Sequence, residues 1–437
     1  MEALISGLVV LALIFLFLGS GVWVFAGLLM VSVTGLMFLL DFAPQRIGTI
    51  ASSIMYRSAS SWEVAAIPMF IFIGEIIFRT DISNRLFRGL APWVDRIPGR
   101  LTHTNVLGCT LFAAVSGSSA ATTATVGKIT TTELRERGYN RNLSIGSLAG
   151  AGSFGLLIPP SIVMIIYGLL AETSIIRLFA AGMLPGLMIA GLYMLYIGVR
   201  AAMDPELAPA ADETGPTWGD RMRGLLDLLP VIALMTLILG AIYSGLATPS
   251  EAAAVGATAA LMVTAVLGQL NYRMLSEAIM GTVKLSAMVC SILVAAAFLS
   301  TAMGYLHIPQ EIAQAIAALD ISVWQLLLIL ALFYIILGLF LDGISILVMS
   351  LPITLPLIAQ AGLDPIWFGI YVIILIELGQ MTPPVGFNLF VIQGLTKEPL
   401  GRIAWAALPF FILMCIGAIL ICVFPGIALW LPNVLYG

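Results

Sequence analysis

Charged residues are scarce in this chain of 437 residues: Asp, Glu, Lys and Arg make up 10%, against 60% apolar residues, and the mean hydropathy is +1.08. A water-soluble fold could not bury so much apolar surface, so the composition excludes one and indicates an integral membrane protein. The net charge of −4 is small and says nothing about partners. No nucleic-acid partner is expected.

Cysteine is rare and catalytic patterns are missing. The four cysteines lie in apolar surroundings without the spacing of metal ligands: Cys109, Cys290, Cys415 and Cys422. They are predicted to be packing residues, with no disulfide framework or metal centre.

The sequence has no nucleophile–base constellation, phosphate-binding loop or metal-ligand cluster. We therefore predict no catalytic residues, no enzyme activity and no cofactor.

The N-terminal apolar run, Ala3–Leu18, has no basic residue ahead of it, and a cleavable signal peptide normally begins with one. It therefore predicts a retained first span. A membrane-spanning helix needs about 20 apolar residues. On this basis the predicted full spans are 3–19, 21–42, 63–79, 142–170, 178–200, 228–247, 251–268, 285–305, 365–393 and 403–432.

Between the third and fourth spans of the first half lies the apolar segment Leu101–Thr132, with arginines clustered in 79–100 before it and in 135–141 after it. Basic clusters mark the cytoplasmic side. Since both ends lie on one side, the segment predicts a re-entrant hairpin with its tip at Ser116-Gly117-Ser118-Ser119. The preceding segment Asp81–Ile97 alternates apolar and basic faces at helical spacing, and predicts an interfacial amphipathic arm.

The second half repeats this plan without basic residues, since Lys and Arg are absent from Leu285 to Thr396. Here the expected arm is His307–Asp320, and the expected hairpin is Ile321–Gln360 with its tip at Asp342-Gly343. Five spans plus a hairpin per half is an odd count, which would insert the second half upside down. We therefore predict an all-α fold of two inverted-topology repeats, 1–200 and 225–437, joined by a cytoplasmic connector at 201–224. Both termini would be periplasmic, leaving only Arg46, Arg57 and Arg177 of the basic residues outside.

The motif Gly-x-x-x-Pro-Pro occurs twice in long apolar segments, at 155–160 and 379–384. Adjacent prolines remove backbone donors, and glycine tolerates unwound backbone, so each copy predicts a broken helix. Such backbone is tolerated at bilayer depth only inside protein or along a wet cavity. The carbonyls expected to lack a donor four residues on are those of Gly155, Ile158, Gly379 and Met381, and Thr382 adds a hydroxyl.

The first tip is a run of small hydroxyl residues and glycines, from Ser116 to Gly127. Such a turn exposes carbonyls that suit sodium and helix N-terminal amides that suit a carboxylate. Close helix packing through small residues is the alternative. Three acids also fall at membrane depth, Glu75, Asp342 and Glu377. Asp342 could orient its tip or join a cation shell, and both Asp342 and Glu377 could relay protons or simply be satisfied by nearby donors.

Taken together, these motifs resemble the large membrane subunit of tripartite ATP-independent periplasmic (TRAP) transporters, within the ion transporter superfamily of elevator carriers. The resemblance covers nearly the whole chain. It rests on the Ser-Gly-Ser-Ser tip, both breaks, Leu-Asp-Gly at 341–343 and Pro-Val-Gly-Phe-Asn at 384–388. It implies sodium-driven uptake of an organic acid, such as a C4-dicarboxylate, sialic acid or sugar acid, across the bacterial inner membrane. A periplasmic binding protein and a small four-helix membrane subunit would be the partners.

The resemblance also implies two sodium sites, one for each tip and break. The first would use Ser116, Ser119, Gly155, Ile158 and Pro160. The second would use Gly343, Gly379, Met381, Thr382 and Pro384. The residues expected to contact substrate are Ser118, Ser119, Thr122, Ser345 and Asn388. Two other functions stay open: a self-sufficient anion/sodium symporter of the same superfamily, and a channel or scaffold subunit whose broken helices only line a pore.

Overall fold

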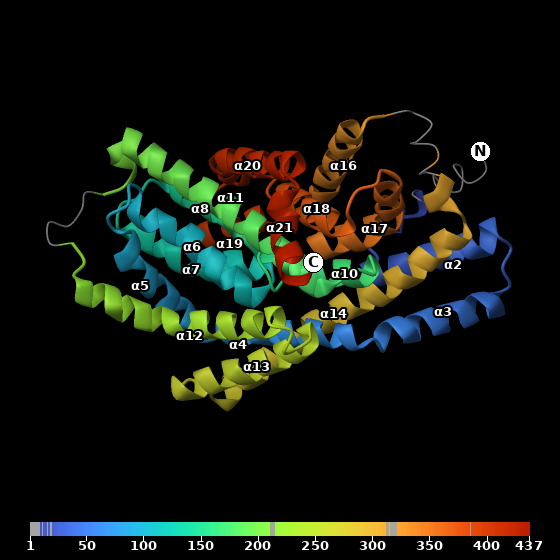
Figure 1. The fold of residues 1–437 in the computed structure, drawn as a ribbon, viewed down its shortest axis with the longest axis horizontal. Helices are drawn as coiled ribbons and strands as arrows, with labels where there is room; N and C mark the ends of the chain where they lie inside the picture. Colours follow the sequence, from blue (N-terminus) through green and yellow to red (C-terminus); the bar gives the residue numbers. More distant parts are fainter. Residues whose placement is uncertain are drawn as a thin grey trace.

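The computed structural model describes residues 9–437 except 11, 15, 18, 19, 210–214, 312, 313, 315–320 and 385. The described part is helical and contains no strand. Its first half consists of α2 (Val24–Leu39), α3 (Pro44–Ala59), the 3-10 turn η1 (Trp62–Ala65), α4 (Ala66–Phe78), α5 (Ile82–Val94), η2 (Arg100–Thr102), α6 (His103–Ser116), α7 (Ser119–Glu136), α8 (Arg141–Gly152), α9 (Phe154–Leu157), α10 (Ile162–Leu170) and α11 (Ile175–Met203). Figure 1 shows these helices from blue to green.

The second half follows the turn η3 (Pro205–Leu207) and runs from yellow-green to red in Figure 1. Its helices are α12 (Trp218–Tyr243), α13 (Pro249–Val266), α14 (Tyr272–Tyr305), α16 (Val323–Gly338), α17 (Gly343–Gln360), α18 (Pro365–Gln380), α19 (Phe387–Thr396), α20 (Leu400–Val423) and α21 (Gly426–Tyr436). Helices α11 and α12 both extend into the range predicted as connector.

Both expected hairpins turn close to their predicted tips. Gly117 ends α6 with a left-handed φ of 59°, a conformation glycine adopts without steric cost, and Ser118 then caps α7 by accepting from the amide of Ala121. In the second hairpin Asp342 caps α17. The expected arm at 81–97 is α5, whereas most of the arm expected at 307–320, including Ile312, lies outside the described residues.

Both Gly-x-x-x-Pro-Pro segments interrupt a helix. Helix α9 ends at Leu157, and α10 starts at Ile162 after a bend of 41° in the helix axis. Helix α18 ends at Gln380, and α19 starts at Phe387. The proline pairs are cis in both places. The two halves thus share an order of hairpin followed by broken helix.

Three helical boundaries differ from those expected. Helix α3 lies between the predicted spans 21–42 and 63–79, where no helix was predicted, because its polar residues, Arg46 and Arg57 among them, lower the apolar content of a helix that buries Ile47 against α2 and α14. Helix α14 starts at Tyr272, since its charged first turns continue the apolar span as one helix. The last predicted span divides at Pro425, which lacks a backbone donor.

Among the described residues, six helices are long and apolar enough to cross a membrane, or eight if two bent pairs each count as one span. This count is lower than the ten full spans predicted, because α2 has only 16 residues and the second broken helix divides into two short helices. The first predicted span lies mostly outside the described residues.

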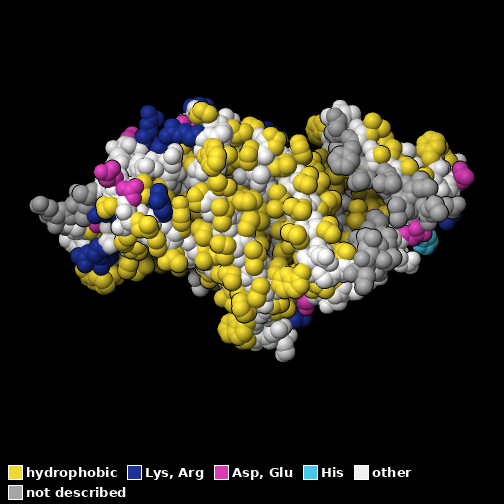
Figure 2. All heavy atoms as spheres, turned by 90° about the horizontal axis from the view of Figure 1, so that it is seen from above, with side chains coloured by type: hydrophobic (Ala, Val, Ile, Leu, Met, Phe, Trp, Pro, Cys, Tyr) yellow, Lys and Arg dark blue, Asp and Glu magenta, His cyan; other side chains and the backbone are white. Residues whose placement is uncertain are grey.

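The surface is divided along the long axis of the molecule. Figure 2 shows hydrophobic side chains over the central body and most of the visible Lys and Arg side chains at one end. That end is where α8 and α12 begin and α11 finishes in Figure 1. An apolar belt with a basic end is typical of a membrane protein whose basic end faces the cytoplasm.

Candidate ion and substrate site

The first hairpin tip lies directly on the first break. A Cβ at Gly155 would overlap the backbone of Ser118 and Ser119, so only glycine fits there. The amide of Ile162 donates to the carbonyl of Gly117 at 3.5 Å. In a continuous helix the Ile162 amide would donate to the carbonyl of Ile158, four residues earlier. Here it donates to the hairpin tip instead. Tip and break are therefore joined backbone to backbone.

Hydroxyl groups of the first tip contact one another. The Ser116 and Thr122 hydroxyl oxygens lie 2.8 Å apart, and the Ser116 hydroxyl also donates to the carbonyl of Ser118 at 3.4 Å. A Cβ on Gly117 would lie 3.0 Å from the carbonyl oxygen of Pro160, which places that oxygen beside the tip. Hydroxyl and carbonyl oxygens thus converge where the first sodium site is predicted.

The second hairpin meets its break through glycines. A Cβ on Gly379 would lie 2.7 Å from the Cα of Gly338, the last residue of α16. Met381 is 2% exposed, and the Thr382 hydroxyl donates to the carbonyl of Leu378 at 2.7 Å. Pro384 is exposed. The structure thus brings Gly379 against the end of α16.

The second tip is held by Asp342. Its carboxylate accepts from the amides of Ile344 and Ser345 at 3.1 and 3.2 Å, and from the Ser345 hydroxyl. These are the bonds of a helix N-cap. The carboxylate thus orients the tip backbone, which is one of the roles expected for this acid, and it engages the Ser345 hydroxyl within the second tip.

Glu377 lies at the centre of the arrangement and is 0% exposed. Its carboxylate accepts from the Ser119 hydroxyl on the first tip and from the Asn388 amide nitrogen, 3.4 Å away at the start of α19. The Leu156 backbone of the first break also hydrogen-bonds to it. No Lys, Arg or His among the described residues forms an ion pair with Glu377. One buried acid therefore links the first tip to both breaks.

The second tip reaches the same region from the other side. A Cβ on Gly343 would lie 2.6 Å from the Gln380 amide nitrogen and 2.9 Å from a methyl carbon of Leu156. Gly343 therefore lies between the two broken helices. Asn388, close by in sequence to the second break, has a buried side-chain oxygen with no hydrogen-bond partner among the described residues.

Two contacts could not be expected from the sequence, that of Gly379 with Gly338 and that of Gly343 with Leu156. Gly338 and Leu156 carry no motif of their own. Only the general preference for small residues at close helix contacts could have singled out Gly338. Glu75 lies elsewhere: it pairs with Arg79 and packs against Gly281 on α14. It takes no part in the contacts between tips and breaks described above.

Apolar helices, two hairpins and two broken helices that meet around a buried acid define a multi-pass membrane transport protein. The family model described as "Tripartite ATP-independent periplasmic transporter, DctM component" matches residues 10–427. The chain belongs to this family, so the resemblance seen in the sequence is confirmed. Since the relatives are named as permease subunits, the prediction of a transport protein without enzyme activity is also confirmed.

Two relatives illustrate the similarity. The C4-dicarboxylate TRAP transporter large permease protein DctM of Pseudomonas aeruginosa is 34% identical over 401 residues, covering 92% of this chain and 93% of the relative. The sialic acid TRAP transporter large permease protein SiaM of Vibrio cholerae is 28% identical over 390 residues, covering 89% and 90%. These two relatives are named for chemically different acids.

The fold also resembles the solved structure of the Alcanivorax borkumensis YdaH transporter. The TM-score is 0.63, with 15% sequence identity, over 89% of this chain and 90% of that chain. At this identity the likeness concerns the fold alone.

Proposed function

We propose that this chain is the transport subunit of a sodium-driven secondary transporter that takes up an organic acid delivered by a periplasmic binding protein. The observation that carries the proposal is the meeting of both tips and both breaks around Glu377. Broken helices that converge on one buried place are typical of the binding sites of secondary transporters.

Sodium suits the groups at both sites. Sodium is a hard cation that prefers oxygen ligands, and the first site offers the hydroxyls of Ser116 and Ser119 with the carbonyls of Gly155, Ile158 and Pro160. The second would use Gly343, Gly379, Met381, Thr382 and Pro384. The Thr382 hydroxyl, which donates to Leu378, keeps lone pairs for an ion.

Glu377 gives a reason why the binding of sodium and the binding of substrate should depend on each other. A carboxylate substrate that approaches this buried carboxyl group is repelled whenever the group is ionised, and this repulsion is strong where the local dielectric constant is low. Bound sodium would offset it, so sodium should raise the affinity for substrate, and substrate should raise the affinity for sodium by the same factor. The substrate contacts proposed are Ser118, Ser119, Thr122, Ser345 and Asn388.

The order of hairpin and broken helix in each half supports two inverted repeats that work as an elevator, with both termini periplasmic. Single cysteines near Arg137 and near Ala361, in a background without the four native cysteines, should then be labelled from opposite sides of the inner membrane. Labelling of both from the same side would contradict the inverted arrangement.

The partners are part of the proposal. The chain reconstituted alone should show little uptake, and addition of a small membrane subunit and a binding protein should restore it. Strong sodium-dependent uptake by the lone chain would favour the self-sufficient symporter. Flux that does not saturate would favour a channel.

The central experiment measures initial uptake of a panel of radiolabelled organic acids in proteoliposomes against sodium concentration at fixed membrane potential. We expect saturable uptake with a Hill coefficient for sodium above one. Uptake that ignores sodium and follows a proton gradient would contradict sodium coupling, and would direct attention to Asp342 and Glu377 as proton carriers.

A further inference from the structure

A cleft of about 770 Å³ opens between α4, α5, α7 and the start of α14. Helix α7 runs from this cleft to the first hairpin tip. The cleft adjoins the arginine clusters at 79–100 and 135–141, which the positive-inside rule assigns to the cytoplasm. It therefore lies between the proposed substrate site and the cytoplasmic solution.

Six charged side chains line the cleft, and five of them are paired. Those in ion pairs are Arg79 with Glu75 and Glu277, Asp81 with Arg85 and Arg88, Glu133 with Arg137, and Arg273 with Glu277. The sixth is Lys128, an exposed residue of α7 that forms no ion pair in the described part of the chain. Its ammonium group is thus the one charge of the lining left for a ligand.

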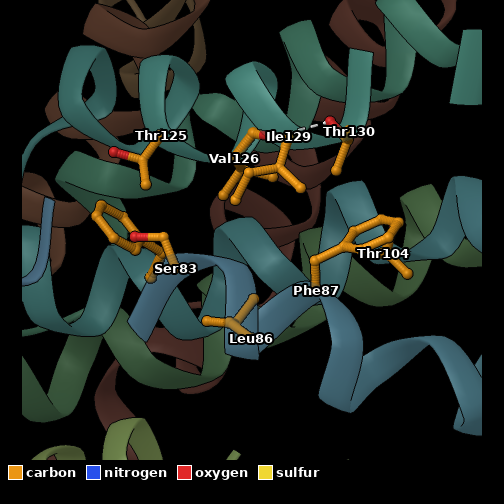
Figure 3. A pocket seen from close by; sticks show the side chains of 9 residues that line it. Ser83, Leu86, Phe87, Thr104, Thr125, Val126, Ile129 and Thr130 are labelled. Carbon is orange, nitrogen blue, oxygen red and sulfur yellow. Dashed lines mark hydrogen bonds between the residues drawn. The ribbon is translucent and has the colours of Figure 1, made fainter. Parts of the chain in front are cut away.

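Lys128 belongs to a polar stripe that begins at the tip. Thr125, Lys128 and Thr132 are spaced by three and four residues, which places them on one side of α7, and Ser118, seven residues before Thr125, caps the same helix. Thr125 has a buried hydroxyl oxygen without a hydrogen-bond partner among the described residues. Figure 3 shows Thr125 and Ser83 on opposite walls of a hollow between α7 and α5, and both residues also line the cleft.

We propose that this cleft is the cytoplasmic exit for the transported anion and that Lys128 is a transient binding site for its carboxylate. The inference rests on the proposed uptake of an organic acid. An ion pair between exposed groups is worth only about 0.2–1 kcal/mol, so it would attract the anion without trapping it. A site on an exit path must be weak enough for the ligand to leave.

The proposal predicts an effect confined to the cytoplasmic side. Proteoliposomes would hold the chain with its small subunit, with binding protein outside and [14C]succinate as the probe. Two quantities would be measured: the external KM, and the concentration of preloaded internal succinate that halves the initial uptake rate. In Lys128→Gln we expect the internal half-inhibitory concentration to rise roughly threefold, as loss of one exposed ion pair implies, with an unchanged external KM.

Two further variants sharpen the test. Lys128→Arg keeps the charge and should leave both quantities within twofold of the wild type. Lys284→Gln removes another exposed lysine, which lies on α14 outside the cleft lining, and should leave both unchanged.

Three results would overturn the inference. Equal shifts of both quantities in Lys128→Gln would mean a general effect on the transport cycle. A lower rate or yield with both quantities unchanged would mean that Lys128 only anchors α7 at the membrane surface. An effect of the same size in Lys284→Gln would mean that any lost lysine acts alike. If the wild-type chain takes up no acid from the panel, the proposed function fails first and the exit site with it.

Discussion

Pro159 and Pro160 of the first break are buried, whereas Pro383 and Pro384 of the second are exposed. Helix α11 accounts for part of the difference, since a Cβ on its Gly186 would lie 2.8 Å from a side-chain carbon of Ile158. The same motif therefore produces a break in both halves, and the neighbouring helices decide how far each break is exposed.

The hairpins differ in a matching way. The first tip touches its break through backbone atoms on both sides, at Gly155 and at Gly117. At the second, Gly343 meets its surroundings through the side chains of Gln380 and Leu156. Backbone contacts leave little room to adjust, whereas side-chain ends can move. A methyl group at Gly343 should therefore do less harm to the second pair of tip and break than one at Gly155 does to the first, although Gly379 meets Gly338 through backbone atoms.

The largest effect is expected for Gly155→Ala. The added methyl group overlaps the backbone of the first tip, and such overpacking costs about 1–3 kcal/mol, or roughly five- to 150-fold in ion affinity. Sodium titrations of initial uptake should show this loss and a Hill coefficient that falls towards one. Gly191→Ala is the control, because a Cβ there meets nothing within 4 Å. Wild-type sodium dependence in Gly155→Ala would contradict the backbone contact.

The next largest effect is expected at Glu377, which links the first pair of tip and break to the second break. Glu377→Gln preserves the shape but replaces one carboxyl oxygen by an amide nitrogen, and a buried donor left without its acceptor costs about 1–3 kcal/mol, so we expect uptake to fall roughly tenfold. Ser119→Ala removes the donor from the other side. Because both changes act on the same hydrogen-bonded group, the double variant should lose less than the two single losses combined. Fully additive losses would show that the two residues act separately.

A smaller effect is expected for Gly343→Ala. The new methyl group meets three side chains, those of Gln380 and Leu156 at their flexible ends and that of Ile376, and no backbone, so the cost should be about 1 kcal/mol, roughly fivefold in the apparent sodium affinity. Gly379→Ala is the matched variant, because its methyl group meets the Cα of Gly338 and should do more harm. If Gly343→Ala proves as severe as Gly155→Ala, the contrast between the two pairs is wrong.

The sequence predicts the tips and breaks well because glycine, proline and capping residues act locally. Gly117, Ser118 and the proline pairs stop or start helices within a few residues. It could not predict that Ser119 meets Glu377, since 258 residues separate them and only the packing of both halves brings them together. Helix α3 was not predicted for another reason: its many polar residues leave no apolar run long enough to be recognised as a span.

The smallest effect concerns an ion pair that ties the two broken-helix regions at the basic end of the molecule. Arg141, at the start of α8, lies 3.2 Å from Glu398, which follows α19, and Arg402 lies 3.1 Å from the same carboxylate. The hydrogen bond from Arg141, together with Arg402, lowers the pKa of Glu398. A lowered pKa means that this contribution to stability is present above the unfolded value, about 4.3, and is lost as pH falls through the folded one.

At pH 7 the pair should therefore be intact, but its partly exposed position limits it to less than about 1 kcal/mol. Glu398→Gln should lower the Tm of the purified protein by roughly 1 °C at low salt, and by less at high salt, where the charges are screened. Uptake should stay within twofold of the wild type. Glu133→Gln removes a more exposed pair, with Arg137 at the C-terminal end of α7, and should change Tm less. A large loss of uptake in Glu398→Gln would mean that the two breaks communicate through their cytoplasmic ends as well as through Glu377.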